Sequence, residues 1–319
     1  MASPRRVDVA RILASHIHID PVFLNSPLFR HPALDASIGC EVVSKVETLN
    51  PIRSFKGRGA ELYVATELRA GETLVSASAG NFGQGLAHAT SRRGYDCIVF
   101  AAESANALKV EAMRRLGANV HLVGADFDQA KLAAREFAHE RGFRFVEDGA
   151  EPIIAEGAGT IGVELAASAG HLDAVTVPLG DGALLAGIGA AIQHLAPRIE
   201  IIGVVAEKAP ALQLSLAAGR TIETADADTI ADGIAARVPV PEALVLLDGL
   251  YDSIVAVTED QIVNGMQLAH QHLGLVIEPA GAVGLAAIVA DPQRFRGKRV
   301  ATILTGSNIS DAVRQRLIG

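Results

Sequence analysis

Short apolar β-like runs alternate along this chain with longer stretches that have the periodicity of amphipathic helices. Seven of these runs are candidate strands: residues 41–45, 73–76, 97–101, 119–123, 174–178, 201–205 and 300–304. Because consecutive positions are apolar, these runs are expected to be buried on both faces, as in parallel sheets. The alternation predicts βα units and therefore an α/β fold, with mostly parallel twisted sheets flanked by helices.

Two of the intervening stretches have clear helical patterns. Residues 107–116 carry periodic apolar positions, and residues 128–140 are alanine-rich and charged on one side, so both are predicted to be surface helices. Glycines stand where left-handed helix stops are expected, at Gly94, Gly117, Gly142 and Gly170. The least regular segment, 206–241, is expected to supply substrate-facing or interface elements.

Composition and charge narrow the class of protein. A chain of 319 residues, 50% of them hydrophobic, can bury a large core, most simply in two lobes. The net charge of −8 and the scattered Lys and Arg residues provide no basic face, so neither nucleic acid nor a membrane is expected as a partner. Cys40 and Cys97 are too few for a disulfide framework and lack zinc-site spacing, so both are expected to be buried, reduced thiols.

The first 20 residues show no targeting pattern. Arg11, His16 and His18 interrupt any apolar core, so neither a signal peptide nor a transmembrane span is predicted. The cytoplasm is therefore the expected location.

Lys56 has the clearest chemical implication of any residue. A lysine with an ordinary pKa near 10 is a poor nucleophile at pH 7 and becomes useful where its surroundings lower that pKa. Lys56 stands at a strand-to-helix transition beside the small residues Gly57 and Gly59, so a flat ring has room to approach. The positive end of the helix dipole is expected to depress its pKa. The alternative is an ordinary surface lysine at a helix start, and three further segments argue against it.

One of these segments is a glycine-rich loop, residues 179–187, that follows the run 174–178 and opens a helix of small residues. Glycines let consecutive backbone N–H groups turn toward one anion, and the helix N-terminus adds its dipole, so the loop is a candidate phosphate cradle. A nucleotide site is disfavoured, because no Lys-Ser/Thr pair completes a P-loop and the dinucleotide spacing is absent. A tight turn without a ligand is the remaining alternative.

Polar residues follow two other predicted strands. The backbone N–H groups of Ser78, Ala79, Gly80 and Asn81 are candidates to hold a carboxylate, with the Asn81 amide donating to a phenolic oxygen. The alternative for Asn81 is a plain helix cap. Thr305 ends the last predicted strand, and its hydroxyl is a candidate partner for a ring nitrogen, although such residues are usually structural.

From about residue 27 to residue 308 the chain resembles the fold-type II pyridoxal-phosphate enzymes, specifically the serine/threonine dehydratase and serine racemase family. The resemblance rests on eight segments, whose order and spacing together are specific: 54–60 (Ser-Phe-Lys-Gly-Arg-Gly-Ala), 78–81 (Ser-Ala-Gly-Asn) with Gln84, 109–118, 157–162, 180–184, 231–233 (Ala-Asp-Gly), 278–280 (Glu-Pro-Ala) and 305–308 (Thr-Gly-Ser-Asn). The fold it implies has a small mobile domain, residues 45–145, nested in a large cofactor-binding domain, residues 1–44 and 146–319. The small domain is expected to close over the substrate.

The resemblance also implies roles for individual residues. It implies pyridoxal 5'-phosphate as the cofactor, held by Lys56 through a Schiff base, with Phe55 and Gly233 flanking its ring. It implies that Asn81 contacts the ring oxygen and that Thr305 meets the pyridine nitrogen. Further residues implied to bind the cofactor are Gly180, Asp181, Gly182, Ala183, Leu184 and Glu278, and those implied to bind substrate are Ser78, Ala79, Gly80, Asn81 and Phe82.

Several positions depart from the family pattern. Ala79 stands where serine racemases place a second acid/base serine, which favours elimination over racemisation. Phe82 replaces a more usual histidine, and Asp181 and Ala183 replace glycines of the phosphate loop. Because a carboxylate repels a phosphate, the Asp181 side chain must point away from it, either turned out to solvent or paired with a cation.

Two further departures concern a metal and a regulatory domain. Glu207 matches a residue of the family's divalent-cation site, but Gln213 stands where its acidic partner is expected, so no metal is predicted. The sequence ends at Gly319, so a C-terminal regulatory domain like that of biosynthetic threonine dehydratases is not expected.

The sequence therefore predicts a pyridoxal-phosphate-dependent lyase, an ammonia-lyase that converts a β-hydroxy amino acid such as threonine or serine to a 2-oxo acid and ammonia. Lys56 removes the α-proton, and the neutral Thr305 hydroxyl favours prompt loss of the β-substituent over transamination. Alternatives are a racemase, another lyase or a β-replacement enzyme on the same cofactor, or a catalytically silent binding protein. The expected partners are a small amino-acid substrate and a second copy of the chain in a homodimer.

Overall fold

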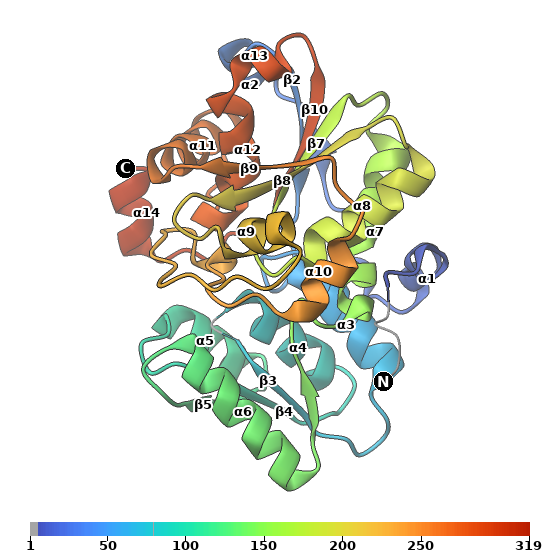
Figure 1. Cartoon of the computed structure of the whole chain (residues 1–319), viewed down its shortest axis with the longest axis vertical. Helices are drawn as coiled ribbons and strands as arrows, with labels where there is room; N and C mark the ends of the chain where they lie inside the picture. The colour runs from blue at the N-terminus through green and yellow to red at the C-terminus, as the bar shows by residue number, and fades with distance from the viewer. Residues whose placement is uncertain (1–5, 79) are drawn as a thin grey trace.

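The computed structural model describes residues 6–78 and 80–319 and contains two β-sheets with helices packed against them (Figure 1). The larger sheet has the strand order β1-β2-β10-β7-β8-β9, and the smaller has the order β5-β4-β3-β6. All neighbouring strands run parallel except β1 and β2. The strands are β1 (Leu28–Phe29), β2 (Glu41–Val46), β3 (Leu74–Ala77), β4 (Cys97–Ala101), β5 (Asn119–Leu122), β6 (Arg144–Val146), β7 (Ala174–Pro178), β8 (Glu200–Ala206), β9 (Ser253–Val257) and β10 (Arg299–Leu304).

Helices connect these strands, as expected for βα units. They are α1 (Val9–Ala14), α2 (Pro32–Ile38), α3 (Lys56–Glu67), α4 (Asn81–Ser91), α5 (Ala107–Arg115), α6 (Phe127–Arg141), α7 (Pro152–Ser168), α8 (Ala183–Leu195), α9 (Ala211–Ala218), α10 (Pro241–Leu247), α11 (Glu259–Leu273), α12 (Pro279–Ala290), α13 (Pro292–Phe295) and α14 (Asp311–Leu317), with short 3-10 turns η1 (Ser15–Ile17), η2 (Pro21–Phe23) and η3 (Asp232–Ile234). Within the described ranges, no helix combines the length and the apolar character needed to cross a membrane.

The predicted α/β class and all seven predicted strands are confirmed, with ends that differ by at most one residue. The expected burial on both faces is wrong for β5, which is partly exposed because it lies at the edge of the smaller sheet. The predicted helices correspond to α5 and α6, and the four predicted glycine stops all have positive φ: Gly94, Gly117, Gly142 and Gly170. Strands β1, β6 and β9 were not predicted. The first two span only two and three residues, too few to show a period, and β9 is a half-exposed edge strand.

Helices cover both faces of the larger sheet, with α11 and α12 on one side and α7 and α8 on the other (Figure 1). Val175 and Val177 of β7 join the core that includes α8, whereas Ala174 joins the core that includes α12. The smaller sheet lies within residues 74–146, and α5 and α6 lie beside it (Figure 1). This range overlaps the predicted small domain, residues 45–145, whose mobility stays a prediction.

The carboxyl ends of strands from both sheets meet at one place. Ser78 follows β3, Asp148 follows β6, Gly180 follows β7 and Thr305 follows β10, and all four residues line the same cavity. Ligands of open parallel α/β sheets bind outside the carboxyl ends of their strands. The topology therefore places a candidate site between the two sheets.

A buried ion network around Arg58 fixes helix α3 at this site. The Arg58 side chain has no exposed surface, and its Nε and Nη2 donate to the two carboxylate oxygens of Glu47 at 2.9 and 2.8 Å. Its Nη1 donates to Thr160 at 2.9 Å and to Glu164 at 2.6 Å. Glu164 also pairs with Lys45 of β2. The network ties α3 to β2 and α7, two residues after Lys56.

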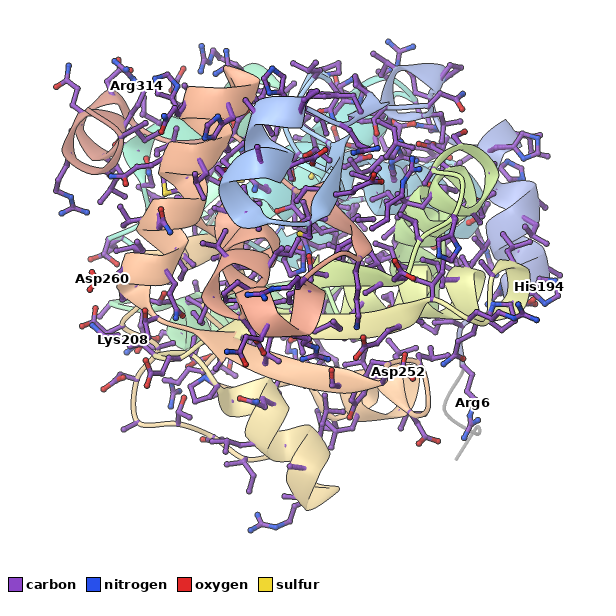
Figure 2. The ribbon with its side chains drawn as sticks, turned by 90° about the horizontal axis from the view of Figure 1, so that it is seen from above. Arg6, His194, Lys208, Asp252, Asp260 and Arg314 are labelled. Carbon is purple, nitrogen blue, oxygen red and sulfur yellow. The ribbon has the colours of Figure 1, made fainter. Side chains whose placement is uncertain are left out.

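We expect Arg58→Met to lower the free energy of unfolding by about 3–5 kcal/mol, because Glu47 would keep a buried carboxylate without its counterion. Urea denaturation followed by circular dichroism measures this loss. Arg6→Ala is the control, since the Arg6–Asp248 pair is exposed (72% and 65%) and Arg6 lies at the periphery of the molecule (Figure 2). It should leave the denaturation midpoint unchanged. A loss in Arg58→Met no larger than that of the control would contradict this account.

Candidate functional site

A cavity of about 450 Å³ lies at the carboxyl ends of the strands. Most of the residues predicted from the sequence line it: Phe55, Lys56, Ser78, Gly80, Asn81, Phe82, Gly180, Asp181, Gly182, Leu184, Gly233, Glu278 and Thr305. Ala183 lies in the first turn of α8 just behind this lining, and Ala79 lies outside the described residues. The irregular segment contributes residues 232–240 to this lining, and its substrate-facing role stays a prediction.

Lys56 is the first residue of α3, and its amine points into the cavity between two carboxylates. Its Nζ donates to Asp148 Oδ2 at 2.5 Å and to Asp181 Oδ2 at 2.7 Å. The Phe55 ring centroid lies 4.9 Å from the same nitrogen. Only 10% of the Lys56 side chain is exposed, so the surface-lysine alternative is wrong.

The electrostatics of Lys56 differ from the prediction made from sequence. Burial disfavours its charged form, but the negative charges of Asp148 and Asp181 outweigh burial and raise the pKa of Lys56 above its ordinary value. The expected lowering of its pKa by the helix dipole is therefore wrong. Two contacting carboxylates act more strongly on one ammonium than a partial charge at a helix end.

The glycine loop forms the predicted strand-to-helix turn. Gly182 is the N-cap of α8 with φ +101°, a left-handed conformation that favours glycine. Gly180 allows close packing, because a Cβ there would lie 2.9 Å from Ile234 Cα. The Asp181 carboxylate is paired with a cation, Lys56, rather than turned out to solvent. Its Oδ1 also accepts a hydrogen bond of 3.0 Å from the Ala183 N–H.

Asn81 belongs to a chain of polar contacts on the opposite side of the cavity. Its Nδ2 donates to Glu278 Oε1 at 2.6 Å, and its Oδ1 accepts from Asn308 Nδ2 at 2.8 Å. Lys109 Nζ donates to Asp232 at 2.6 Å and lies 3.7 Å from Glu278 Oε2. Burial raises the pKa of Glu278 to about 7, and the Lys109 charge offsets this only in part. Asn81 is thus held in place by side chains from two other segments.

The segment that contains Ser78 differs in part from its predicted role. The Ser78 N–H donates to the Phe100 carbonyl at 3.0 Å, so it does not point at a ligand. The Ser78 hydroxyl accepts from the N–H groups of Gly80 and Gly83 at 3.2 and 2.9 Å and so caps the start of α4. The expectation that the N–H groups of Ser78 and Gly80 hold a carboxylate is therefore not met in this conformation.

Thr305 and Phe55 are joined at the base of the cavity. The Thr305 carbonyl accepts from the Phe55 N–H at 3.0 Å, and Ser54 and Gly306 form an isolated antiparallel bridge beside them. The end of β10 therefore positions the residue that precedes Lys56. Gly233 lines the cavity from η3, so the two residues predicted to flank a ring come from separate elements.

Asp148 was not predicted from the sequence, although it touches the central amine. It follows β6, which spans only three residues and could not be recognised as a strand. Without that strand, nothing in the sequence marks Asp148 as a residue at the carboxyl edge of a sheet. Lys109 and Asp232 lay within segments noted for the family resemblance, yet their contact joins residues 123 positions apart. Only the folded chain brings them together.

A family model described as pyridoxal-phosphate dependent enzyme matches residues 19–306. This chain belongs to that family. The fold-type II resemblance drawn from the sequence motifs is thereby confirmed, as is the cofactor that it implied.

Relatives of this pyridoxal-phosphate enzyme carry related names. The biosynthetic L-threonine dehydratase of Salmonella typhimurium is 34% identical over 289 residues, which cover 89% of this chain and 56% of that protein. The L-threonine ammonia-lyase of Thermotoga maritima is 35% identical over 282 residues, 88% of this chain and 70% of that protein. The structure of maize serine racemase superposes with a TM-score of 0.91 at 25% identity, covering 98% of this chain and 97% of that chain. The chain thus spans about half the length of the biosynthetic relative.

The residues present fit pyridoxal phosphate. The N-terminus of α8 already holds an anionic group, because the Ala183 N–H donates to the Asp181 carboxylate, so this end of the cavity suits a phosphate. Lys56 supplies the primary amine that an aldehyde requires. Phe55 and Gly233, the residues expected to flank a ring, both line the cavity. In this pyridoxal-phosphate enzyme, Asp181 and a phosphate compete for the same donors.

The described residues offer neither a metal-binding cluster nor an exposed cysteine thiol. Among residues 6–78 and 80–319, no cluster of three or more His, Cys, Asp or Glu side chains is arranged to hold a metal ion. Glu207 is exposed, and Gln213 Nε2 donates to the Ile254 carbonyl at 3.4 Å. Both cysteines are free and buried, as predicted, and burial raises the pKa of Cys40 to about 11 and that of Cys97 to about 12.

We expect Asp181→Gly to bind pyridoxal phosphate roughly tenfold more tightly, about 1.4 kcal/mol. The change removes a carboxylate that repels the phosphate and frees the Ala183 N–H. Fluorescence titration of the cofactor-free protein measures the dissociation constant, and pyridoxal, which lacks the phosphate, is the matched ligand. The gain should be larger for pyridoxal phosphate than for pyridoxal, and an equal gain for both would contradict the phosphate role.

Gly182→Val in the same titration should weaken cofactor binding strongly. A side chain at position 182 is strained by the positive φ, and its Cβ would lie 3.0 Å from Leu247 Cδ1 in the core, so the turn that begins α8 would be displaced. Small effects of both substitutions would mean that residues 180–184 do not form the phosphate cradle.

Proposed function

We propose that this chain catalyses the β-elimination of a β-hydroxy amino acid, such as threonine or serine, to a 2-oxo acid and ammonia. The observation that carries the proposal is the position of the Lys56 amine, at a helix N-terminus suited to phosphate and at the end of the strands of both sheets. Two relatives named as a threonine dehydratase and a threonine ammonia-lyase support the reaction class.

Pyridoxal phosphate, when bound, supplies the electron sink that makes the α-proton of an amino acid removable. The residues of this chain do the rest. The α8 N-terminus with residues 180–184 would hold the phosphate, and Phe55 and Gly233 would enclose the ring. Asn81, held by Glu278 and Asn308, would donate its remaining amide hydrogen to the ring oxygen. Thr305 would present a neutral hydroxyl to the ring nitrogen.

Lys56 would act as the base. Its Nζ removes the α-proton from the face of the substrate that it contacts, and burial in the cavity keeps water away from that nitrogen. Loss of the β-hydroxyl then gives an enamine, which takes up water and releases ammonia. Gly80 and Phe82 line the side of the cavity where the substrate would bind.

Racemisation is the competing reaction, favoured by the structural likeness to maize serine racemase. A two-base racemase needs an acid/base group on each face of the substrate. Residue 79 is an alanine and carries no exchangeable proton, so the second face has no donor at that position. Elimination needs only the lysine face and is therefore the better-supported activity.

Lys56→Ala and Lys56→Arg should both abolish turnover and the visible absorption band of the lysine-bound cofactor, since neither side chain can form the link. Lys56→Arg is the matched variant, because it keeps a positive charge beside Asp148 and Asp181. Equal loss in the two variants assigns the defect to chemistry rather than to charge. Near-wild-type elimination by either purified variant would show that Lys56 is not the base.

Product analysis decides between the two reactions. We expect 2-oxo acid and ammonia in large excess over inverted amino acid when L-serine and L-threonine are supplied, because residue 79 offers no second base. Coupled assays measure the oxo acid, and chiral chromatography measures inversion. Inversion faster than elimination would overturn the lyase assignment.

We also infer a homodimer located in the cytoplasm. Both inferences rest on the resemblance to the serine/threonine dehydratase family. Analytical ultracentrifugation of the cofactor-loaded protein tests the first.

A further inference from the structure

Asp148 and Asp181 converge on one amine, yet their surroundings differ. Asp181 has a partner for each oxygen: Oδ1 accepts from the Ala183 N–H at 3.0 Å, and Oδ2 accepts from Lys56 at 2.7 Å. Asp148 Oδ2 accepts from Lys56 at 2.5 Å, but Asp148 Oδ1 is buried and has no hydrogen-bond partner in the part of the chain that the structure describes. A buried ionised oxygen without a partner is costly, and a proton on Asp148 removes that cost.

The pKa values of Asp148 and Asp181 differ as well as their hydrogen-bond partners. Burial raises the pKa of Asp148 to about 7, the charge of Asp181 adds to this, and the charge of Lys56 opposes it. Burial also acts on Asp181, but the Lys56 charge and its hydrogen bonds hold the pKa of Asp181 below its usual value. Two neighbouring carboxyl groups with divergent pKa values divide into an acid and a charged partner.

The other charged groups nearby do not compete for this role. Lys56 on α3 and Asp181 on the β7–α8 loop are the charges that act on Asp148. The adjacent Glu147 instead pairs with Lys131 at 3.1 Å and with Arg135, both on α6. The Asp148 side chain is 15% exposed and lines the cavity, so it lies where a substrate can reach it.

We propose that Asp148 is a further catalytic residue, the general acid that protonates the departing β-hydroxyl and is recharged by Lys56. The proposal rests on the proposed β-elimination. Asp148 Oδ2 lies 2.5 Å from Lys56 Nζ, so Lys56 can return a proton to Asp148 across this contact once its amine has taken up the α-proton. One contact thus resets both groups after each turnover.

The proton balance closes within these two residues. The neutral Lys56 amine takes the α-proton, and the electron pair of that C–H bond becomes the Cα–Cβ double bond. The Cβ–O bond breaks with its electrons on oxygen, which takes the proton from Asp148 and leaves as water. The Lys56 ammonium then returns a proton to the Asp148 carboxylate, so both groups regain their starting states without another reactant.

Leaving-group dependence tests this role. In cofactor-saturated Asp148→Asn, we expect kcat for L-serine to fall roughly 10²–10⁴-fold, the usual contribution of a general acid. For β-chloro-L-alanine we expect kcat to stay close to wild type, because chloride departs without a proton. The exchange of the α-proton of L-alanine in D2O, followed by NMR, should also persist, because it needs only the base.

Asp181→Asn is the matched control. It removes the other carboxylate beside Lys56, so it should change the rates on L-serine and β-chloro-L-alanine by the same factor. Asp148→Ala provides the same rate ratio if Asp148→Asn does not fold. A readout independent of turnover is the infrared C=O band of the protonated Asp148 carboxyl at pH 6, isolated as a difference spectrum between wild type and variant because Glu278 also has a pKa raised to about 7. We expect that band to be lost in Asp148→Asn and retained in Asp181→Asn.

The outcomes are distinct. Equal loss on the two substrates in Asp148→Asn, or no loss on L-serine, would overturn the role of Asp148 while leaving β-elimination intact. Retention of the infrared band in Asp148→Asn would overturn it as well. Wild-type protein that eliminates neither water nor chloride would instead refute the proposed function.

Discussion

The buried ion network of Arg58 is the constraint on which the site depends. Arg58 pairs with Glu47, which directly follows β2, and with Glu164 of α7, so α3 begins at a defined place between the two sheets. Buried charges tolerate little displacement, because any separation leaves a carboxylate without its counterion. Lys56 lies two residues before Arg58 in the same helix, so these contacts also restrict its position. The position of the amine is therefore set by ionic contacts on the other side of the same helical turn.

The cavity brings opposite requirements together. A phosphate calls for helix N–H groups and no nearby anion, whereas a reactive lysine calls for a local proton acceptor. This chain places Asp181 within reach of both the α8 N-terminus and Lys56, and adds Asp148 from the end of β6. The two carboxylates raise the pKa of Lys56 instead of lowering it. In this arrangement the two carboxylates favour the charged form of the Lys56 amine.

The features that depend on a local pattern of residues could be predicted from the sequence. Apolar runs revealed seven strands, six of which are largely buried, whereas β5 at the edge of the smaller sheet is partly exposed. A glycine loop revealed the helix N-terminus of α8 because only particular backbone angles permit the turn. Strand prediction failed for β1 and β6, which are too short to show a period, and for β9, which is half exposed. Because β6 was not predicted, Asp148, which follows it, was not recognised as a site residue. The expected lowering of the Lys56 pKa was wrong because it considered the helix dipole but not the carboxylates of Asp148 and Asp181, which lie far away along the sequence.

The sequence by itself determined the α/β class, the family and the cofactor, and it singled out Lys56 as the candidate lysine, because each depends on motifs whose residues are close together along the chain. Only the tertiary structure decided which groups surround that lysine. Asp148 lies 92 residues and Asp181 lies 125 residues from Lys56, and no local pattern encodes a contact across such separations. Electrostatic effects act through space over a few ångströms, so the protonation chemistry of the site depends on how the two sheets bring their strand ends together.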